Sequence, residues 1–305
     1  MEFIDKNKVE TTLDYPSLIS ALRDGFKTDI VSPVRHHHDF KNPKECVDST
    51  LLLMPAWQES ESLGVKLVTV SPNNTKYNLP AINALYILFD AHKGDVEALL
   101  HGKALTTKRT AAASALASSY LSRKDATSML MIGTGDLSSE LILAHASVRD
   151  IKTVFVWGRS LEKSSKIVKK LKDRFDIKAV ENIEDVISEV DIISCATLSQ
   201  KPLVLGKFLK NGQHIDLVGS YKPDMRESDD EVMKISDVYI DTKMALKESG
   251  DLQNIVQEDV KADLFKLCRN EHEGRSDKNQ ITLFKSVGHA LEDLVAAKLV
   301  KERLS

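Results

Sequence analysis

The most constraining feature of the sequence is a β-prone run that leads directly into a glycine-containing turn. Residues 129–138 read Met-Leu-Met-Ile-Gly-Thr-Gly-Asp-Leu-Ser, which matches the pattern G-x-G-x-x-G with Ser138 at the third position. Gly133 permits the tight turn, and Gly135 lets the backbone approach a pyrophosphate. Amides at the start of the following helix would hold phosphate oxygens. The predicted dinucleotide contacts here are Gly133, Thr134, Gly135, Asp136 and Leu137.

The chain around this turn alternates short β-prone runs with helical patterns. Such alternation is typical of a parallel sheet whose strands are connected by helices. Helical patterns follow the first two runs, at residues 137–148 and 161–175, with apolar positions at helical spacing. This context favours a dinucleotide site over a purely structural turn. Strands are predicted at residues 128–132, 153–157, 191–196, 214–218 and 238–241.

The end of the second predicted strand carries the signal for cofactor choice. An enzyme that uses NAD usually places Asp or Glu there to bind the ribose 2′-hydroxyl, whereas one that uses NADP offers Arg instead. In this chain the strand is followed by Gly158, Arg159 and Ser160. We predict that Arg159 and Ser160 bind a 2′-phosphate and that the cofactor is NADP, used as NADPH. The alternative is that Arg159 is a solvated surface residue and that NAD binds without the acidic contact.

The first part of the chain follows a different pattern, with β-prone runs separated by Pro, Asn and Gly. An Ala- and Ser-rich helix comes next, with Thr106 or Thr107 as an available N-cap. The segment 270–279 is the most loop-like and is expected to lead the chain back to the first domain. The elements predicted outside the parallel sheet are a helix at 15–26, β-prone runs at 51–54, 64–70 and 80–89, a helix at 106–121 and a last helix at 286–304.

Composition excludes several classes of protein. A chain of 305 residues with 42% hydrophobic and 29% charged residues is globular and suggests two domains or one large α/β domain. A net charge of -3 provides no basic field for nucleic acid or an anionic membrane. The N-terminus lacks the apolar core of a signal peptide, and no apolar run approaches the ~20 residues that span a bilayer. Three widely spaced cysteines argue against a disulfide framework. We expect a cytoplasmic protein.

Two features invite a catalytic or metal-binding interpretation that the rest of the sequence does not support. His36 and His38 would share one face of a strand and could supply two metal ligands, but nothing provides a third at recognisable spacing. We therefore predict no metal site and expect these histidines to pack and form hydrogen bonds. Cys195 lies at the end of a predicted strand and is expected near the nicotinamide. A nucleophilic role is not expected, because no partner base is evident.

Several short motifs occur in an order that resembles the ornithine cyclodeaminase/mu-crystallin family over nearly the whole chain. Each motif is weak alone, and the combination is specific. The motifs are Pro33-Val34-Arg35, Gly64-Val65-Lys66, Lys108-Arg109-Thr110-Ala111-Ala112, the Gly133 turn, the run from Gly219 to Glu227 (Gly-Ser-Tyr-Lys-Pro-Asp-Met-Arg-Glu) and Phe284-Lys285-Ser286-Val287-Gly288.

The resemblance implies an α/β fold in which a Rossmann-type parallel sheet domain is inserted into an α+β substrate-binding and dimerisation domain. The expected boundaries are 1–115 for the first part of the substrate domain, 116–280 for the Rossmann domain and 281–305 for the returning helix. It also implies a homodimer and hydride transfer between nicotinamide and the α-carbon of an imino or amino acid. Further cofactor contacts implied by the resemblance are Thr110, Ala196, Thr197 and Val287.

By motif match, Arg35, Lys66 and Arg109 become the cations that hold the substrate carboxylate. Physical chemistry supports this independently for two of them. Lys66 sits inside an apolar strand, where an ammonium without an anion is costly. Arg109 is expected in the first turn of a helix, where the helix N-terminus is already positive. The alternatives are a buried ion pair with an internal Asp or Glu, and a solvated Arg.

One departure from the cyclodeaminases bears on the reaction. Those enzymes carry an acid–base Asp two residues before the proline of the fifth-strand motif, and this chain has Tyr221 there, before Pro223. The motif is closer to the pyrroline-2-carboxylate (ketimine) reductase branch. We therefore predict NADPH-dependent reduction of a cyclic imino acid, with Lys66, Asp224 or an ordered water as the proton donor. The alternatives are an oxidative L-amino acid dehydrogenase (alanine or arginine type), an ornithine cyclodeaminase, and a non-catalytic binding protein of mu-crystallin type.

Overall fold

The computed structural model describes residues 2–305, which form two compact units with a sheet in each. Unit 1 comprises the residues up to Thr110 together with His289–Ser305, and unit 2 comprises Ala111–Gly288. The chain passes from one unit to the other within α3 (Gly102–Leu121). Residues 281–288 extend unit 2, although we had placed them in the returning segment, because they contain a strand of its sheet.

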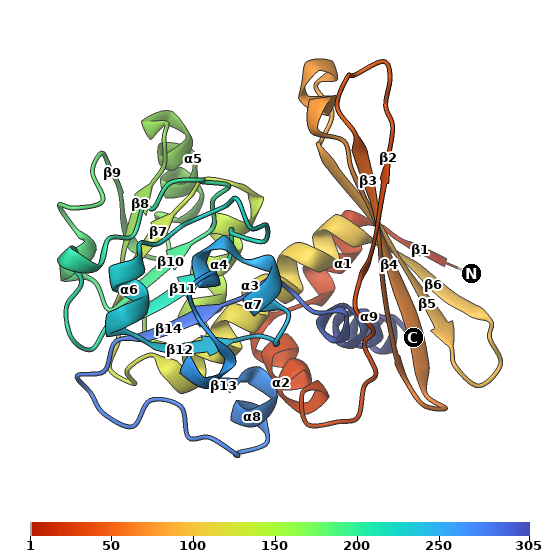
Figure 1. The fold of residues 1–305 in the computed structure, drawn as a ribbon. Coiled ribbons are helices and arrows are strands. Elements are labelled where there is room, and N and C mark those ends of the chain that lie inside the picture. The colour runs from red at the N-terminus through yellow and green to blue at the C-terminus, as the bar shows by residue number, and fades with distance from the viewer. Residues whose placement is uncertain (1) are drawn as a thin grey trace. The chain divides into compact units, whose positions relative to one another are not determined.

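Unit 1 is built on a six-stranded sheet with the order β1-β6-β5-β4-β3-β2. All neighbours are antiparallel except β1 and β6, which are parallel. The helices lie on the same side of this sheet in Figure 1. The elements are β1 (Glu2–Ile4), α1 (Lys6–Thr12), α2 (Tyr15–Gly25), β2 (His36–Phe40), β3 (Ser49–Gln58), β4 (Ser62–Val70), a 3-10 helix (Pro72–Tyr77), β5 (Ile82–Asp90), β6 (Val96–His101), the start of α3 and α9 (Ala290–Leu304).

The two faces of this sheet differ in character because successive strand residues point to opposite sides. On the helix face Lys66 lies between Met54 of β3 and Tyr86 of β5, and all three side chains are buried. The opposite face carries apolar residues that are only half-buried, such as Val65 and Leu67. One face therefore holds a buried charge under α9, and the other is an open apolar surface.

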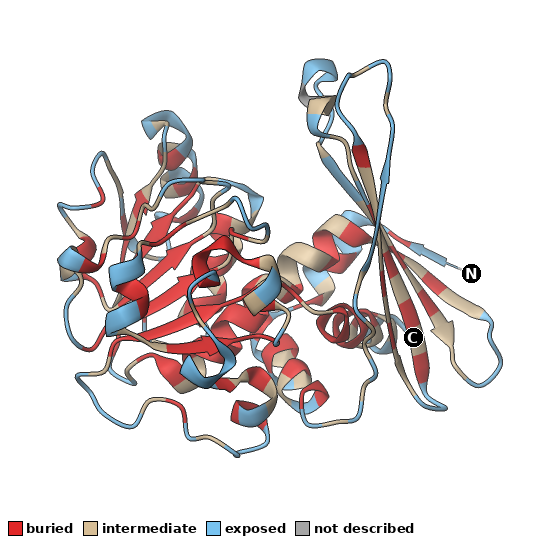
Figure 2. Cartoon of the chain, viewed as in Figure 1, coloured by how far each residue is buried: buried red, intermediate tan, exposed pale blue. Residues whose placement is uncertain are grey.

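Unit 2 is an eight-stranded sheet in which all neighbours are parallel, in the order β13-β12-β14-β11-β10-β7-β8-β9. Figure 2 shows that these strands are mostly buried, as expected for a parallel sheet covered by helices. The strands are β7 (Ser128–Ile132), β8 (Thr153–Trp157), β9 (Asp176–Val180), β10 (Ile192–Cys195), β11 (His214–Leu217), β12 (Asp237–Ile240), β13 (Val260–Asp263) and β14 (Thr282–Lys285). The helices are α4 (Asp136–Ala146), α5 (Leu161–Leu171), α6 (Asp230–Ile235), α7 (Ala245–Glu248) and α8 (Leu264–Cys268), with the second half of α3.

This is the Rossmann-type sheet that the sequence predicted, and the five predicted strands are all present within one or two residues of their expected ends. Three strands were missed, namely β9, β13 and β14. The loop at 270–279 leads into β14 rather than back to unit 1, so that expectation was wrong. Among residues 2–305, no helix is both long enough and apolar enough to cross a membrane.

The start of α3 was also predicted wrongly. The helix begins at Gly102 rather than at Thr106 or Thr107, and its first turn is capped by His101, whose Nδ1 accepts the backbone N–H of Ala104 at 3.2 Å. Arg109 therefore lies two turns inside α3 and not in its first turn, so the argument from the helix dipole does not apply to it.

Candidate active site

The predicted phosphate-binding turn lies between β7 and α4 and has the geometry that its glycines require. Gly133 has φ +121°, and a Cβ there would meet the carbonyl oxygen of Ala196 at 2.5 Å. Gly135 is the N-cap of α4 and has no side chain to bond the helix amides, while the space where its Cβ would stand is open. These features fit a nicotinamide dinucleotide, whose pyrophosphate needs a close backbone approach and free helix amides.

A cavity of about 360 Å³ opens beside this turn in unit 2. Seven predicted cofactor residues line it: Gly133, Thr134, Gly135, Arg159, Ser160, Ala196 and Thr197. Sequence reasoning missed six others: Trp157, Gly158, Lys163, Leu198, Ser199 and Leu203. The predicted contacts Thr110, Asp136, Leu137 and Val287 are not among the lining residues. The cavity therefore runs from the end of β8, past the phosphate turn, to the loop after β10.

The end of β8 presents positive charge to this cavity. Arg159 is exposed, and Ser160 caps α5 by accepting the backbone N–H of Lys163 at 3.4 Å. Lys163 lies in the first turn of α5 and lines the same cavity. Among the described lining residues none is a carboxylate, so the acid that usually binds the ribose 2′-hydroxyl of NAD does not stand here.

A second cluster of charges is buried in unit 1, between the sheet and α9. Nζ of Lys66 lies 2.7 Å from Oδ2 of Asp293. Nε of Arg109 lies 2.9 Å from Oδ1 of the same carboxylate, and its Nη1 lies 2.5 Å from Oε2 of Glu292. All four side chains are at most 5% exposed. The buried ion pair that we considered as an alternative for Lys66 and Arg109 is therefore present, and its acids come from α9.

The charges in this cluster shift one another's pKa values. Burial, together with repulsion from Arg109, lowers the pKa of Lys66 to about 8 in spite of Asp293. Burial opposes the charge of Asp293, but Arg109 and Lys66 outweigh it and lower the pKa of Asp293. The positive charge of Arg35 also acts to lower the pKa of Lys66, so the three predicted carboxylate ligands gather in one region.

Other predicted residues are placed as follows. Asp224 is exposed in unit 2 and accepts a hydrogen bond from Nε2 of Gln200 at 3.0 Å. Tyr221 is partly buried, and burial raises its pKa. The His36 and His38 rings lie edge to face on the exposed strand β2, and the described residues include no group of three potential metal ligands. Cys195 is buried, which raises the pKa of its thiol well above the usual value, as a non-nucleophilic cysteine requires.

A Rossmann-type sheet with a phosphate-binding turn and an adjoining cavity defines a dinucleotide-binding protein. The model of the ornithine cyclodeaminase/mu-crystallin family matches residues 3–305, and the chain belongs to this family. A Δ1-pyrroline-2-carboxylate reductase of Colwellia psychrerythraea is 36% identical over 316 residues, which cover 100% of both chains.

Two solved structures resemble the whole chain. Thermococcus litoralis Δ1-pyrroline-2-carboxylate reductase, in complex with NADH and L-proline, has a TM-score of 0.91 at 31% identity, covering 99% of this chain and 97% of its own. An archaeal alanine dehydrogenase dimer with bound NAD also has a TM-score of 0.91, at 26% identity, covering 99% of this chain and 95% of its own. The predicted family and Rossmann-type fold class are thus confirmed.

Proposed function

We propose that this protein is an NAD(P)H-dependent reductase of cyclic imino acids such as Δ1-pyrroline-2-carboxylate, with a preference for NADPH. The observation that carries the proposal is the cluster of Lys66, Arg109 and Arg35 in unit 1. The reductases named above, one of them bound to NADH and L-proline, support the substrate class. The glycine turn and the cavity in unit 2 support the cofactor.

The buried ion pairs leave the cationic cluster able to bind a substrate carboxylate. An ammonium has three N–H donors and a guanidinium has five, and the distances to Asp293 and Glu292 account for only some of them. Asp293 would therefore orient Lys66 and Arg109, whose remaining N–H donors would bind an anionic substrate beside Arg35.

Reduction adds a hydride to the imine carbon and a proton to the imine nitrogen, so that C=N becomes CH–NH. When bound, a reduced nicotinamide supplies the hydride. We propose Lys66 as the proton donor, because a pKa of about 8 keeps its ammonium protonated near neutral pH while making the proton easier to release than from a solvated lysine. Asp224 remains the second candidate. The contribution of the other cations is to position the substrate and to stabilise its charge.

We also propose that the protein works as a homodimer in which a second copy covers the open apolar face of the unit 1 sheet. Leu53, Leu67 and Leu85 lie opposite one another across three strands of this face, and each is only half-buried. An apolar surface of this kind is typical of an interaction site. The archaeal alanine dehydrogenase, which is described as a dimer, supports this assembly.

Oxidation of NADPH by the purified protein, followed with a panel of cyclic imines and with α-keto acids plus amines, tests the proposed function. We expect turnover with Δ1-pyrroline-2-carboxylate, no comparable release of ammonia from ornithine, and a dimer by sedimentation velocity. Ammonia release at a rate that rivals imine reduction would establish a cyclodeaminase instead. If the protein oxidises L-alanine with NAD faster than it reduces imines, it is an amino acid dehydrogenase. The resemblance to the archaeal alanine dehydrogenase is the reason for this test.

The cofactor preference makes a separate prediction. Replacing Arg159 with alanine should narrow the preference for NADPH over NADH about tenfold, because a charged hydrogen bond to phosphate contributes ~1.5–3 kcal/mol. Fluorescence titration of both cofactors measures this. Lys169→Ala is the matched control, since it removes a cation from the last turn of α5 that does not line the cavity. Tighter binding of NADH than NADPH by the native protein would contradict the NADPH assignment.

A further inference from the structure

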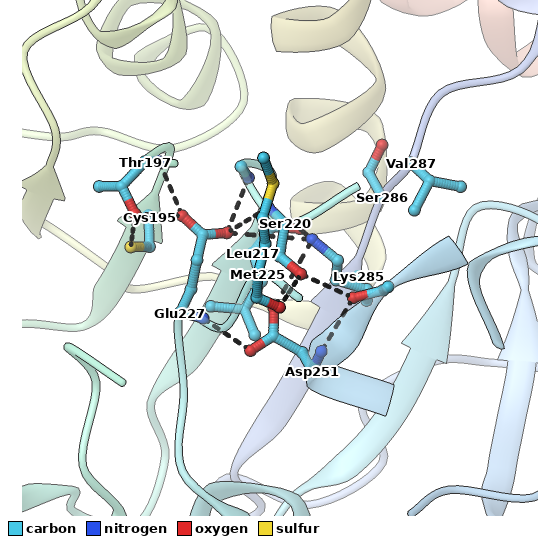
Figure 3. A network of polar contacts seen from close by, with 12 residues as sticks. Cys195, Thr197, Leu217, Ser220, Met225, Glu227, Asp251, Lys285, Ser286 and Val287 are labelled. Atoms are coloured by element: carbon cyan, nitrogen blue, oxygen red, sulfur yellow. Dashed lines mark hydrogen bonds and ion pairs between the residues drawn. The ribbon is translucent and has the colours of Figure 1, made fainter. Parts of the chain in front are cut away.

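Unit 2 contains a cluster of buried charged side chains that have no role in the reaction proposed above. Glu227, Asp251 and Lys285 lie together at the carboxyl edge of the parallel sheet (Figure 3). Nζ of Lys285 is 3.9 Å from Oε2 of Glu227 and 3.9 Å from Oδ2 of Asp251. Burial of three ionisable groups is costly, and a buried ion pair is weak evidence for a gain in stability. The cluster therefore calls for another role.

The carboxylate of Glu227 joins two loops that follow neighbouring strands. Its Oε1 accepts the backbone N–H of Thr197 at 2.7 Å and the hydroxyl of Thr197 at 3.0 Å. Its Oε2 accepts the backbone N–H groups of Gly219 and Ser220, at 2.7 and 3.2 Å. Thr197 follows β10, and the other two residues follow β11. One side chain thus fixes the paths of both loops, as Figure 3 shows from close by.

The rest of the cluster holds Glu227 in place. Oδ1 of Asp251 accepts the backbone N–H groups of Glu227 and Ser228, at 2.8 and 2.9 Å. Nζ of Lys285 donates to the carbonyl oxygen of Leu217 at 3.1 Å, at the end of β11. The two loops also touch directly, because a Cβ on Gly219 would stand 2.0 Å from the carbonyl oxygen of Thr197.

The position of Thr197 connects this cluster with the dinucleotide cavity, which it lines together with the phosphate turn. In a sheet of this kind the dinucleotide lies across the carboxyl ends of the strands, with its pyrophosphate at the first turn. That turn follows β7, which lies between β8 and β10. Arg159 and Ser160 at the end of β8 would contact the adenosine half, which carries the 2′-phosphate. The nicotinamide half would then lie on the β10 side of the turn, near Thr197.

We propose that Glu227 is a positioning residue for the nicotinamide half of the cofactor, acting through the loops that begin at Thr197 and Gly219. This inference rests on the proposed function, since it presupposes that a nicotinamide dinucleotide binds in the cavity. Glu227 is fully buried and does not line the cavity, so it would act through the backbone of these loops rather than by contact with the cofactor. It fixes the backbone against which the nicotinamide ring is held, and the buried Lys285 and Asp251 keep its carboxylate oriented.

The variant Glu227→Gln tests the proposal by binding measurements. An amide has one acceptor oxygen and a donating NH₂ group, so two of the four donors lose their acceptor. Burial, followed by the repulsion from Asp251, raises the pKa of Glu227 in spite of Lys285, so removing the charge also removes a cost and the variant is expected to fold. We expect NADPH to bind about tenfold or more weakly. Binding of 2′,5′-ADP, which lacks the nicotinamide half, should change less than twofold.

Two further variants keep the result unambiguous. Asp229→Asn removes a neighbouring carboxylate that caps α6, and both ligands should bind to it as to the native protein. Asp251→Asn keeps the shape of the side chain but removes a charge of the cluster that orients Glu227, and Asp251 does not line the cavity. This variant should show the same selective loss in a smaller amount, and it decides the matter if Glu227→Gln does not fold.

Equal weakening of NADPH and 2′,5′-ADP in the folded variants, or no weakening of either, would overturn the role of Glu227. If the native protein binds NADH more tightly, NADH and ADP replace the two probes. A native protein that binds neither dinucleotide would refute the proposed function and this inference together. Normal binding by the native protein, without a selective loss in the variants, refutes the inference alone.

Discussion

Lys66→Met is expected to lower kcat/KM for Δ1-pyrroline-2-carboxylate by about ten- to several-hundred-fold, because one charged hydrogen bond in a dry site contributes ~1.5–3 kcal/mol. Affinity for NADPH should stay nearly unchanged, since the phosphate turn belongs to unit 2 and Lys66 to unit 1. A cyclic imine without a carboxylate loses only the proton donor and not the carboxylate contact, so its kcat/KM should fall less. Steady-state kinetics on both imines and a fluorescence titration of NADPH make the measurement.

The structure makes a control necessary, because Lys66 is also the partner of a buried acid. Methionine at this position leaves Asp293 with Arg109 alone, and loss of one partner of a buried pair can cost ~3–5 kcal/mol of stability. The double variant Lys66→Met with Asp293→Asn removes both charges of that pair and should recover part of the melting temperature. It should not recover activity toward the carboxylated imine.

The outcome separates two roles for Lys66. If its role is only structural, the double variant recovers activity along with stability, and both imines lose activity equally in the single variant. If it binds the carboxylate, the double variant recovers stability without recovering activity, and the single variant loses more activity toward the carboxylated imine than toward the other. The second result is the one we expect, because Asp293 takes only part of the ammonium's bonding capacity.

The parallel sheet could be predicted from the sequence because several of its strands are short runs of mostly apolar residues. Met129 to Ile132 and Ile192 to Cys195 are buried on both faces, and a strand of this kind needs no knowledge of its neighbours to be recognised. The glycine turn was equally visible, since Gly133 and Gly135 meet backbone requirements that are local to the turn. Features that depend only on neighbouring residues in the chain can therefore be recognised from the sequence.

The features that were missed depend on residues far apart in the chain. Strand β14 has only four residues, and it joins the sheet because β11 and β12 offer edges on either side of it. The acid that pairs with Lys66 is Asp293 on α9, more than two hundred positions away along the chain. No sequence pattern around Lys66 indicates that its partner is Asp293. The sequence predicted that the charge needs an anion, and only the fold supplies its identity.

The hydrogen bonds around Glu227 also depend on residues that are far apart in the chain. The run from Gly219 to Glu227 was used to recognise the family, and its last residue had no assigned purpose. Its four donors belong to Thr197, Gly219 and Ser220, which converge only when β10 and β11 are paired. Similarly, Lys163 was not predicted as a lining residue, because its place in the cavity depends on the pairing of β7 with β8.

The glycine turn provides the last prediction. Gly135→Ala is expected to weaken NADPH binding about ten- to a hundred-fold while leaving the fold intact. Gly135 has ordinary φ of -79°, and nothing in the described chain lies within 4 Å of where its Cβ would stand, so the protein itself tolerates a methyl group. Loss of glycine at this N-cap should cost at most about 1 kcal/mol of stability. The methyl group would instead occupy the space through which the pyrophosphate approaches the backbone.

Two variants in the same motif separate this effect from damage to the turn. Ser138→Ala removes a buried hydroxyl that has no hydrogen-bond partner among the described residues, and both NADPH affinity and melting temperature should stay near their native values. Gly133→Ala places a methyl group 2.5 Å from the carbonyl oxygen of Ala196 at a φ of +121°, so it should lower the melting temperature as well as the affinity. Native affinity in Gly135→Ala would mean that the cofactor does not approach this turn. A loss of affinity with an unchanged melting temperature places the pyrophosphate at Gly135, where the protein leaves room for it.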